Sequence, residues 1–308
     1  MHAYLIMAHK NVNQITTLLK LLDYCDNDIY IHIDKKSNEE TKNYDFSKIC
    51  RKSKVYQYSV INLRWGNISQ IHCELFLMRK AHENKKYEFY HLLSGMDLPL
   101  KNQKYIHDFF DKNAGKEFVN FSGKQKTAEM LINDRVRYYW GTRWYNLIPY
   151  KFSMQIMRKL DFFSIRIQKV LRIDRIRKRN INLYHGAQWV SLTDDFIVDL
   201  LKNEKNIYDQ YKASYCSDEV FVQTFIMDHK KWFDRLYIPK IENGFESIVR
   251  KIDWERGGPY TWHKEDFEEL VNSDFLFARK FDENVDSEII DMIYDYIVGG
   301  SENDKNER

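Results

Sequence analysis

Residues 89–100 read Phe-Tyr-His-Leu-Leu-Ser-Gly-Met-Asp-Leu-Pro-Leu, a short apolar run that breaks into a turn and then resumes. The run from Phe89 to Leu93 has the length and composition of a buried strand, and Ser94-Gly95 is typical of a turn. In open parallel sheets, side chains just past such strand ends line the crevice where nucleotides bind. This segment therefore predicts both a strand and one wall of a ligand site.

Three apolar runs precede this segment, a fourth follows it, and helical patterns lie between them. An alternation of short strands with amphipathic helices is typical of βαβ units around a parallel sheet, so we predict an α/β fold. The predicted strands cover residues 3–8, 29–33, 55–60 and 187–192, and the predicted helices cover residues 12–24, 69–83 and 194–203.

Composition excludes several classes of protein. The chain of 308 residues carries 48 basic and 45 acidic residues, so it lacks the charge excess of a nucleic-acid-binding protein. Its four cysteines show no CxxC spacing, which favours a reducing compartment. The first residues lack a secretory signal, and no window reaches the ~18 apolar residues of a spanning helix. We therefore expect a cytoplasmic location.

The segment 151–182 carries ten basic residues and two acidic ones, interleaved with apolar residues. Two interpretations stay open. It is either a surface that binds an anionic membrane, or a helix packed on the core with a solvated charged face. The first interpretation would make the protein peripheral at the inner face of the plasma membrane.

Ser217-Asp218-Glu219 stands directly before an apolar helical run. A glutamate at this position can project into a cleft and act as a general base, provided its pKa is tuned toward neutrality. The alternative is a capping role, in which Ser217 caps the helix and the two acids complement its dipole.

Two segments bear on phosphate binding. Asp26-Asn27-Asp28 matches an Asp-X-Asp metal motif but precedes a predicted strand, where a metal ligand is not expected, so we discount it. Arg279 and Lys280 lie in an apolar frame and can together hold a diphosphate without metal. The alternative for this pair is an edge strand with surface charges. The ten histidines show no zinc-binding spacing, and we predict no metal.

Four further residues are candidates with structural alternatives. Asp34 ends a predicted strand and can accept hydrogen bonds from a nucleoside, or it is a solvated loop acid. Trp65 and Trp254 can stack on a base or a sugar, or belong to the core. Asp97 can bind sugar hydroxyls, or cap its own turn.

Taken in order, six segments resemble the core 2/I-branching N-acetylglucosaminyltransferase and peptide O-xylosyltransferase family, glycosyltransferase family 14, in a bacterial form. The resemblance spans nearly the whole chain, and the order of the segments carries it more than any one of them. The segments are Ile6-Met7-Ala8-His9-Lys10, His32-Ile33-Asp34-Lys35-Lys36, Leu92 to Lys101, Gly186-Ala187-Gln188-Trp189, Ser217-Asp218-Glu219, and Phe277 to Asp282.

The resemblance implies a GT-A-like fold and an inverting, metal-independent transfer of sugar from a UDP-sugar. Glu219 falls on the family's catalytic base, Asp34 on its nucleotide-contacting aspartate, and Lys280 on its diphosphate lysine. Trp65 falls near uracil, and Trp254 falls on an aromatic residue of the acceptor site. We therefore predict a catalytic Glu219, a donor site and an acceptor site. The donor site comprises His9, Asp34, Trp65, Arg279 and Lys280, and the acceptor site comprises Asp97 and Trp254.

The resemblance also implies one GT-A-like domain over residues 1–300. Residues 1–120 would bind the nucleotide sugar, residues 121–300 would supply the acceptor side, and residues 301–308 would form a disordered tail.

This sequence departs from the family's pattern in two ways. The animal enzymes pair the diphosphate lysine with an upstream arginine, in a segment that is shortened here around residues 257–264; Arg256 or Arg279 would have to substitute. The membrane anchor and cysteine set of the Golgi enzymes are missing, which suggests synthesis of a bacterial surface polysaccharide.

UDP-N-acetylglucosamine is the preferred donor, and a glycan or lipid-linked glycan is the expected acceptor. UDP-xylose or another UDP-hexose is the alternative donor. A different class of function, an inactive nucleotide-sugar-binding or carbohydrate-binding protein, also stays open.

Overall fold

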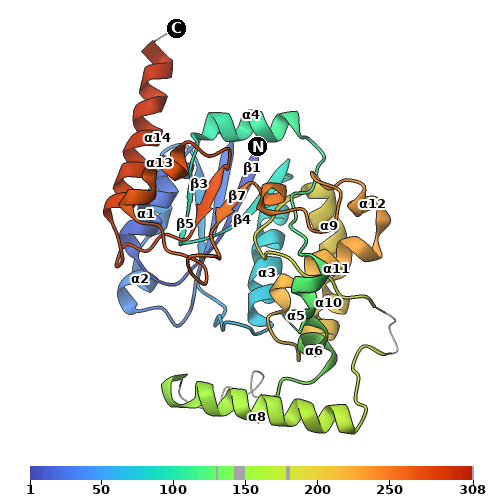
Figure 1. Cartoon of the computed structure of the whole chain (residues 1–308). Coiled ribbons are helices and arrows are strands. Elements are labelled where there is room, and N and C mark those ends of the chain that lie inside the picture. The colour runs from blue at the N-terminus through green and yellow to red at the C-terminus, as the bar shows by residue number, and fades with distance from the viewer. Residues whose placement is uncertain (130, 142–149, 178–180, 307–308) are drawn as a thin grey trace.

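The computed structural model describes residues 1–129, 131–141, 150–177 and 181–306 (Figure 1). Its centre is a five-stranded sheet in the order β3-β2-β1-β4-β6. The first four strands in this order are parallel, and β6 runs antiparallel to β4. The strands are β1 (His2–Ala8), β2 (Asn27–Ile33), β3 (Lys54–Tyr58), β4 (Phe89–Ser94) and β6 (Ser191–Thr193). The predicted α/β class is confirmed.

Helices cover both faces of this sheet, which explains why every residue of its central strands β1, β2 and β4 is buried. Along β1, Leu5 packs into one core and Ile6 into the other, because successive side chains point to opposite faces. The first core includes α3 (Ser69–Asn84) and α9 (Asp194–Lys202), and the second includes α1 (Val12–Leu22) and α14 (Glu288–Asn306).

A second, three-stranded sheet stands beside the carboxyl end of β4. Its order is β5-β8-β7, formed by Asp97–Pro99, Phe277–Arg279 and Arg250–Ile252. The central strand, β8, pairs antiparallel with β5 and parallel with β7. The edge-strand alternative for Arg279 and Lys280 is therefore wrong, because the strand that ends at Arg279 is flanked on both sides.

The remaining helices lie around these sheets, with α8 set apart from the others at the bottom of the view (Figure 1). They are α2 (Glu39–Asn43), α4 (Gln103–Lys112), α5 (Lys124–Glu129), α6 (Ile132–Arg137), α8 (Tyr150–Val170), α10 (Glu204–Tyr211), α11 (Phe221–Asp228), α12 (Lys230–Phe233) and α13 (Phe267–Val271). Among the described residues, no helix combines the length and the hydropathy needed to cross a membrane.

Two predicted elements differ from the structure. The predicted strand 187–192 pairs as a strand only from Ser191 to Thr193, because the residues before it run past the sheet toward the site described below. The predicted disordered tail is helical as far as Asn306, because α14 continues beyond its last core contact near Ile297; residues 307–308 lie outside the described residues.

Arg250 joins the two sheets. Its side chain is fully buried, and its guanidinium donates to the carbonyls of Ile248, Leu92 and Val190 at 3.0–3.1 Å. Burial lowers the pKa of Arg250 to about 10. Leu92 lies on β4, so this one side chain fixes the small sheet against the large one.

Arg250→Ala should lower the free energy of unfolding by about 3 kcal/mol, because it removes three buried hydrogen bonds and leaves a void. Urea denaturation at neutral pH measures this, with Arg51→Ala as the control because Arg51 is exposed. The control should change the free energy of unfolding by less than about 0.5 kcal/mol. Equal midpoints for the two variants would contradict the assigned role.

Candidate functional site

Glu219 closes a short 3-10 turn, Ser217–Glu219, that precedes α11. The turn starts after Cys216, which adopts the left-handed conformation at φ 45°. The N-cap residues are Cys216 for this turn and Val220 for α11, so Ser217 occupies neither N-cap position. The capping alternative is therefore wrong for Ser217. The turn directs the Glu219 carboxylate away from the axis of α11 and toward α6.

Two basic side chains face the Glu219 carboxylate. Arg135 Nη1 on α6 lies 3.0 Å from Oε2, and His185 Nε2 lies 3.3 Å from the same oxygen. Ser122 Oγ contacts the other ring nitrogen of His185 at 2.9 Å and fixes the orientation of the ring. Glu219 keeps 29% of its side chain exposed, so a ligand can approach the carboxylate from solvent.

The charge of Glu219 follows from this setting. Burial raises the pKa of Glu219, but the hydrogen bond and charge of His185 and the charge of Arg135 lower it more, so its pKa lies below the ordinary value. The expectation of a Glu219 pKa near neutrality is therefore wrong. The carboxylate is ionised at neutral pH, which is the state that a general base requires.

Two buried acids lie behind Glu219. Burial and the charge of Glu219 raise the pKa of Asp218 to about 7. Burial, and then the charge of Asp218, raise the pKa of Glu74 on α3 well above its ordinary value. Each acid has one buried carboxyl oxygen without a hydrogen-bond partner among the described residues, Oδ1 of Asp218 and Oε2 of Glu74. Glu219, the member that solvent reaches, is therefore the acid of this cluster with the lowest pKa.

The extended segment 185–189 connects these groups. The amide of Gly186 donates to the Glu219 carbonyl at 3.0 Å, and Gln188 Nε2 donates to Glu74 Oε1 at 2.7 Å. A Cβ at position 186 would stand 1.8 Å from the carbonyl oxygen of Asn120, so only glycine lets the chain pass there. The Gly-Ala-Gln-Trp motif is therefore explained by close backbone packing beside the Glu219 turn.

Arg279 is held from two directions at the end of β8. Its Nη1 donates to Asp97 Oδ1 at 2.7 Å and to Ser94 Oγ, and its guanidinium lies 4.4 Å from the centroid of the Trp189 ring. Lys280 follows directly, half-buried, and makes no ion pair with the described residues. The pair thus contains one anchored cation and one cation that is open to a ligand.

Asp97 is 1% exposed and also accepts from the Ser94 amide at 2.9 Å. The structure shows the turn-capping arrangement, in which the Asp97 carboxylate accepts hydrogen bonds from Ser94 and Arg279. Contact between Asp97 and an acceptor stays a prediction, and it requires the ion pair with Arg279 to open.

Asp34 and Trp65 lie on neighbouring loops past the strand ends. Asp34 Oδ1 accepts from the amides of Lys36 and Leu63 at 3.1 and 3.0 Å, and it thereby holds the loop that carries Trp65. Trp65 is 63% exposed and meets the ring of Tyr215 edge-on, so the core alternative for this tryptophan is wrong. An exposed indole at this edge of the sheet is available for stacking on a base.

His9 follows β1 and lies at the same edge of the sheet. Desolvation by the surrounding atoms lowers the pKa of His9; the charges of Lys10 and Arg279 lower it further, and the charge of Asp34 raises it. The charges of Asp34 and Arg279 both act on His9, so His9 lies near these two predicted donor-site residues.

Trp254 is 49% exposed in the loop after β7, so it too is outside the core. Arg256 beside it is bound by three carboxylates: Asp253, Asp266 at 2.7 Å and Glu269 at 3.1 Å. A guanidinium neutralised in this way is a poor phosphate ligand. Of the two substitutes considered for the missing arginine, Arg279 is better placed, since it has one carboxylate partner.

Sequence analysis did not identify Arg135, His185 or Glu74. His185 directly precedes the Gly186 motif, which is the one signal that pointed toward it. Arg135 and Glu74 gave no signal, because their roles depend on α6 and α3 folding against a turn more than eighty residues away.

The residues that could hold a metal ion lie elsewhere. Two described groups bring three ligand atoms within 4.8 Å of one another, and neither includes a predicted site residue. They are His2, Glu88 and Asp111, and His263, Glu265 and Asp286. In the discounted Asp-X-Asp motif, Asp28 is buried at the start of β2 and accepts from Tyr87 Oη at 2.6 Å.

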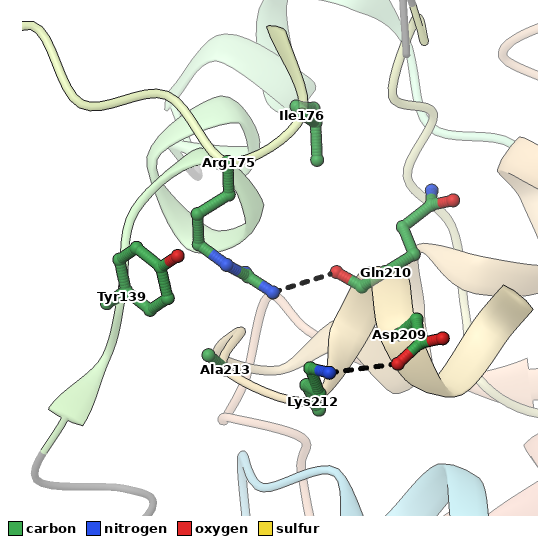
Figure 2. Close-up of a pocket in the computed structure, with 7 residues that line it drawn as sticks. All are labelled: Tyr139, Arg175, Ile176, Asp209, Gln210, Lys212 and Ala213. Carbon is green, nitrogen blue, oxygen red and sulfur yellow. Dashed lines mark hydrogen bonds and ion pairs between the residues drawn. The ribbon is translucent and has the colours of Figure 1, made fainter. Parts of the chain in front are cut away.

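A surface pocket of about 170 Å³ lies between α10 and the segment that follows α8 (Figure 2). Figure 2 shows Arg175 donating to the Gln210 carbonyl, at 3.2 Å, and Lys212 paired with Asp209 at 2.9 Å. Both cations are therefore occupied by the protein itself. The pocket is lined by Tyr139, Arg175, Ile176, Asp209, Gln210, Lys212 and Ala213, none of them a predicted site residue.

The chain has distant relatives among known proteins, and the relatives described here are named as glycosyltransferases. The chain is 22% identical to xylosyltransferase 2 of Rattus norvegicus over 96% of its length, and it spans about a third (34%) of that relative. It is 20% identical to a human beta-1,3-galactosyl-O-glycosyl-glycoprotein beta-1,6-N-acetylglucosaminyltransferase 3, over 96% of this chain and 67% of the relative.

Among solved structures, the apo form of mouse xyloside xylosyltransferase 1 matches with a TM-score of 0.36 and 11% identity, over 90% of this chain and 97% of that one. The model of the Core-2/I-Branching enzyme family matches residues 2–276, which include the five-stranded sheet and the Glu219 turn and end directly before β8. The chain belongs to the Core-2/I-Branching enzyme family.

Proposed function

We propose that this protein is a glycosyltransferase that moves a sugar from a UDP-sugar onto a hydroxyl of a glycan acceptor, with inversion at the anomeric carbon and without a metal ion. One observation carries the proposal. An ionised, solvent-accessible carboxylate, Glu219, is held by Arg135 and His185 in front of two buried acids. Family membership and the names of the relatives, which are xylosyl- and N-acetylglucosaminyltransferases, support the same class of reaction.

In this mechanism Glu219 accepts the proton of the acceptor hydroxyl as the hydroxyl oxygen attacks the anomeric carbon. The bond between the anomeric carbon and the diphosphate oxygen breaks at the same time, and the bonding electron pair leaves with UDP. Attack from the face opposite to the leaving group inverts the configuration. Glu219 then releases its proton to solvent, which its lowered pKa favours.

Departure of UDP places negative charge on the diphosphate, and fixed cations stabilise such charge. Lys280 has no ion-pair partner in the part of the chain that the structure describes, and Arg279 is oriented, since Asp97 and Ser94 hold its Nη1. Asp97 is therefore a positioning residue in this proposal. His9, Asp34 and Trp65 would bind the nucleoside side of the donor.

The donor and acceptor are narrower proposals. UDP-N-acetylglucosamine is preferred and UDP-xylose is the alternative, since relatives of both names match the chain. Trp254, exposed beside the small sheet, would stack on the acceptor glycan. We further propose that the product belongs to a bacterial surface polysaccharide.

Glu219→Gln should reduce acceptor-dependent UDP release by about 10³-fold or more, because the amide cannot take up a proton. The assay supplies the purified protein with UDP-sugars and a panel of glycan acceptors. Donor affinity, measured by calorimetry, should change less than about threefold, because Glu219 faces the acceptor hydroxyl. Equal UDP release by the variant would contradict the proposal, and donor binding without transfer in the wild type would favour a binding protein.

Lys280→Ala should weaken UDP binding by about tenfold to a hundredfold, because it removes the open cation from the diphosphate. Calorimetry in the presence of chelator measures the affinity, with Lys264→Ala as the matched control, since Lys264 is paired with Glu288 on the surface. UDP binding that occurs only with manganese, or that survives in Lys280→Ala, would overturn the metal-free diphosphate site.

A further inference from the structure

We propose that α8 docks the protein on an anionic bilayer surface, with the carboxyl edge of the large sheet turned toward the membrane. This inference goes beyond sugar transfer and does not depend on it. It develops one of the two interpretations left open for the basic segment 151–182. Within this segment, the structure describes the side chains of residues 159–177.

Among the described residues of α8, a narrow stripe packs against the protein, and Phe162 contacts Trp140. Asp161, Ile165 and Gln168 are buried, at the i, i+4 and i+7 spacing of one helix face. Gln168 anchors this stripe through two bonds to the backbone of Tyr139, at 2.8 and 2.9 Å. The described part of the helix is therefore fixed by a mixed stripe, in which Ile165 is apolar and Asp161 and Gln168 are polar.

Five other apolar residues lie away from this stripe, in solvent, four of them on α8 and the fifth, Leu171, directly after it. They follow the spacing i, i+3, i+7, i+10 and i+11, which at ~100° per residue forms one continuous face. A surface helix of a soluble protein has its apolar face toward the core, and here the order is reversed. The face consists of Leu160, Phe163, Ile167, Val170 and Leu171, whose exposed fractions run from 43% to 81%.

Basic residues border this apolar face. Lys159 and Arg166 are exposed and lie on one flank, and Arg172 follows the end of the helix. None of the three forms an ion pair with the described residues, whereas Lys169 is paired with Asp134 at 2.6 Å. An apolar face with a free cationic flank is the arrangement that binds anionic lipid headgroups while inserting side chains below them.

The same charges disfavour a second copy of this chain as the occupant. A two-fold dimer through α8 would bring the same patch against itself. Lys159, Arg166 and Arg172 of one copy would then lie near those of the other, which costs free energy, whereas a bilayer rich in anionic lipid complements them. We therefore assign the face to a membrane surface.

The position of α8 connects docking to the site. In Figure 1, α8 lies below the carboxyl ends of the parallel strands, on the side where Asp34 and Trp65 follow β2 and β3. A chain of aromatic contacts connects α8 to Trp65. The ring of Phe162 on α8 meets the ring of Trp140 edge-on, and Trp140 stacks on Tyr215 with their ring centroids 4.7 Å apart. Tyr215 in turn contacts Trp65. A helix resting on the bilayer would thus hold the site close to a lipid-linked glycan.

Flotation with vesicles tests this inference in the full chain and without nucleotide. Wild-type protein should float with vesicles that contain phosphatidylglycerol and should bind pure phosphatidylcholine vesicles at least about tenfold more weakly. The variant Phe163→Asp/Ile167→Asp should lose about tenfold or more of the binding, because two inserted side chains become charged. The variant Lys159→Glu/Arg166→Glu should bind the anionic vesicles more weakly by a similar factor. Added salt should remove most of the binding that this variant retains.

Val285→Asp is the matched control, because it places a charge on an exposed apolar residue away from α8. Val285 is 52% exposed, between Ile167 at 43% and Phe163 at 63%, and lies in the loop that precedes α14. It should bind vesicles as the wild type does, and circular dichroism should show that all variants are folded. Absence of vesicle binding by the wild type overturns the proposal. Equal binding of the wild type to neutral and anionic vesicles also overturns it. A third contrary result is a wild-type protein that does not bind vesicles but forms a dimer, with the dimer lost in Phe163→Asp/Ile167→Asp. None of these outcomes bears on UDP release, so the two proposals fail separately.

Discussion

The contact of Arg135 and His185 with Glu219 is the interaction on which the chemistry of this protein depends. A carboxylate beside two buried acids would ordinarily take up a proton, since burial and like charge both favour the neutral form. The two basic side chains reverse that balance for Glu219, whose pKa falls below its ordinary value while the pKa values of Asp218 and Glu74 stay raised. The acid that solvent and an acceptor can reach is therefore the most acidic of the three.

The backbone makes this contact possible by bringing three distant parts of the chain together. Gly186 passes so close to Asn120 that a side chain would not fit, and its amide is bonded to Glu219. In the same segment, Gln188 donates a hydrogen bond to Glu74, and the ring of Trp189 contacts the guanidinium of Arg279. A single extended segment therefore positions the base, the buried acid behind it and the cation proposed for the diphosphate.

Much of this architecture could be predicted from the sequence, because it is encoded locally. The strands β1, β2 and β4 each contain a short apolar run, and Asp34 and Trp65 follow strand ends. The partners of Glu219 could not be predicted, since Arg135 and His185 reach it only through tertiary packing. The same holds for Asp97, whose pairing with Arg279 depends on the register of β5 with β8. The apolar face of α8 shows a further limit, because periodicity identifies a face but not the side on which the core lies.

The central claim, that Arg135 and His185 keep Glu219 ionised so that it can serve as the base, is tested most directly by the pH dependence of kcat/KM in wild type and Arg135→Gln. Activity requires the unprotonated carboxylate and falls as pH drops through its pKa. Removal of the arginine charge raises that pKa, so the acid limb of the profile should move to higher pH in the variant. An acid limb at the same pH in both proteins would contradict the account.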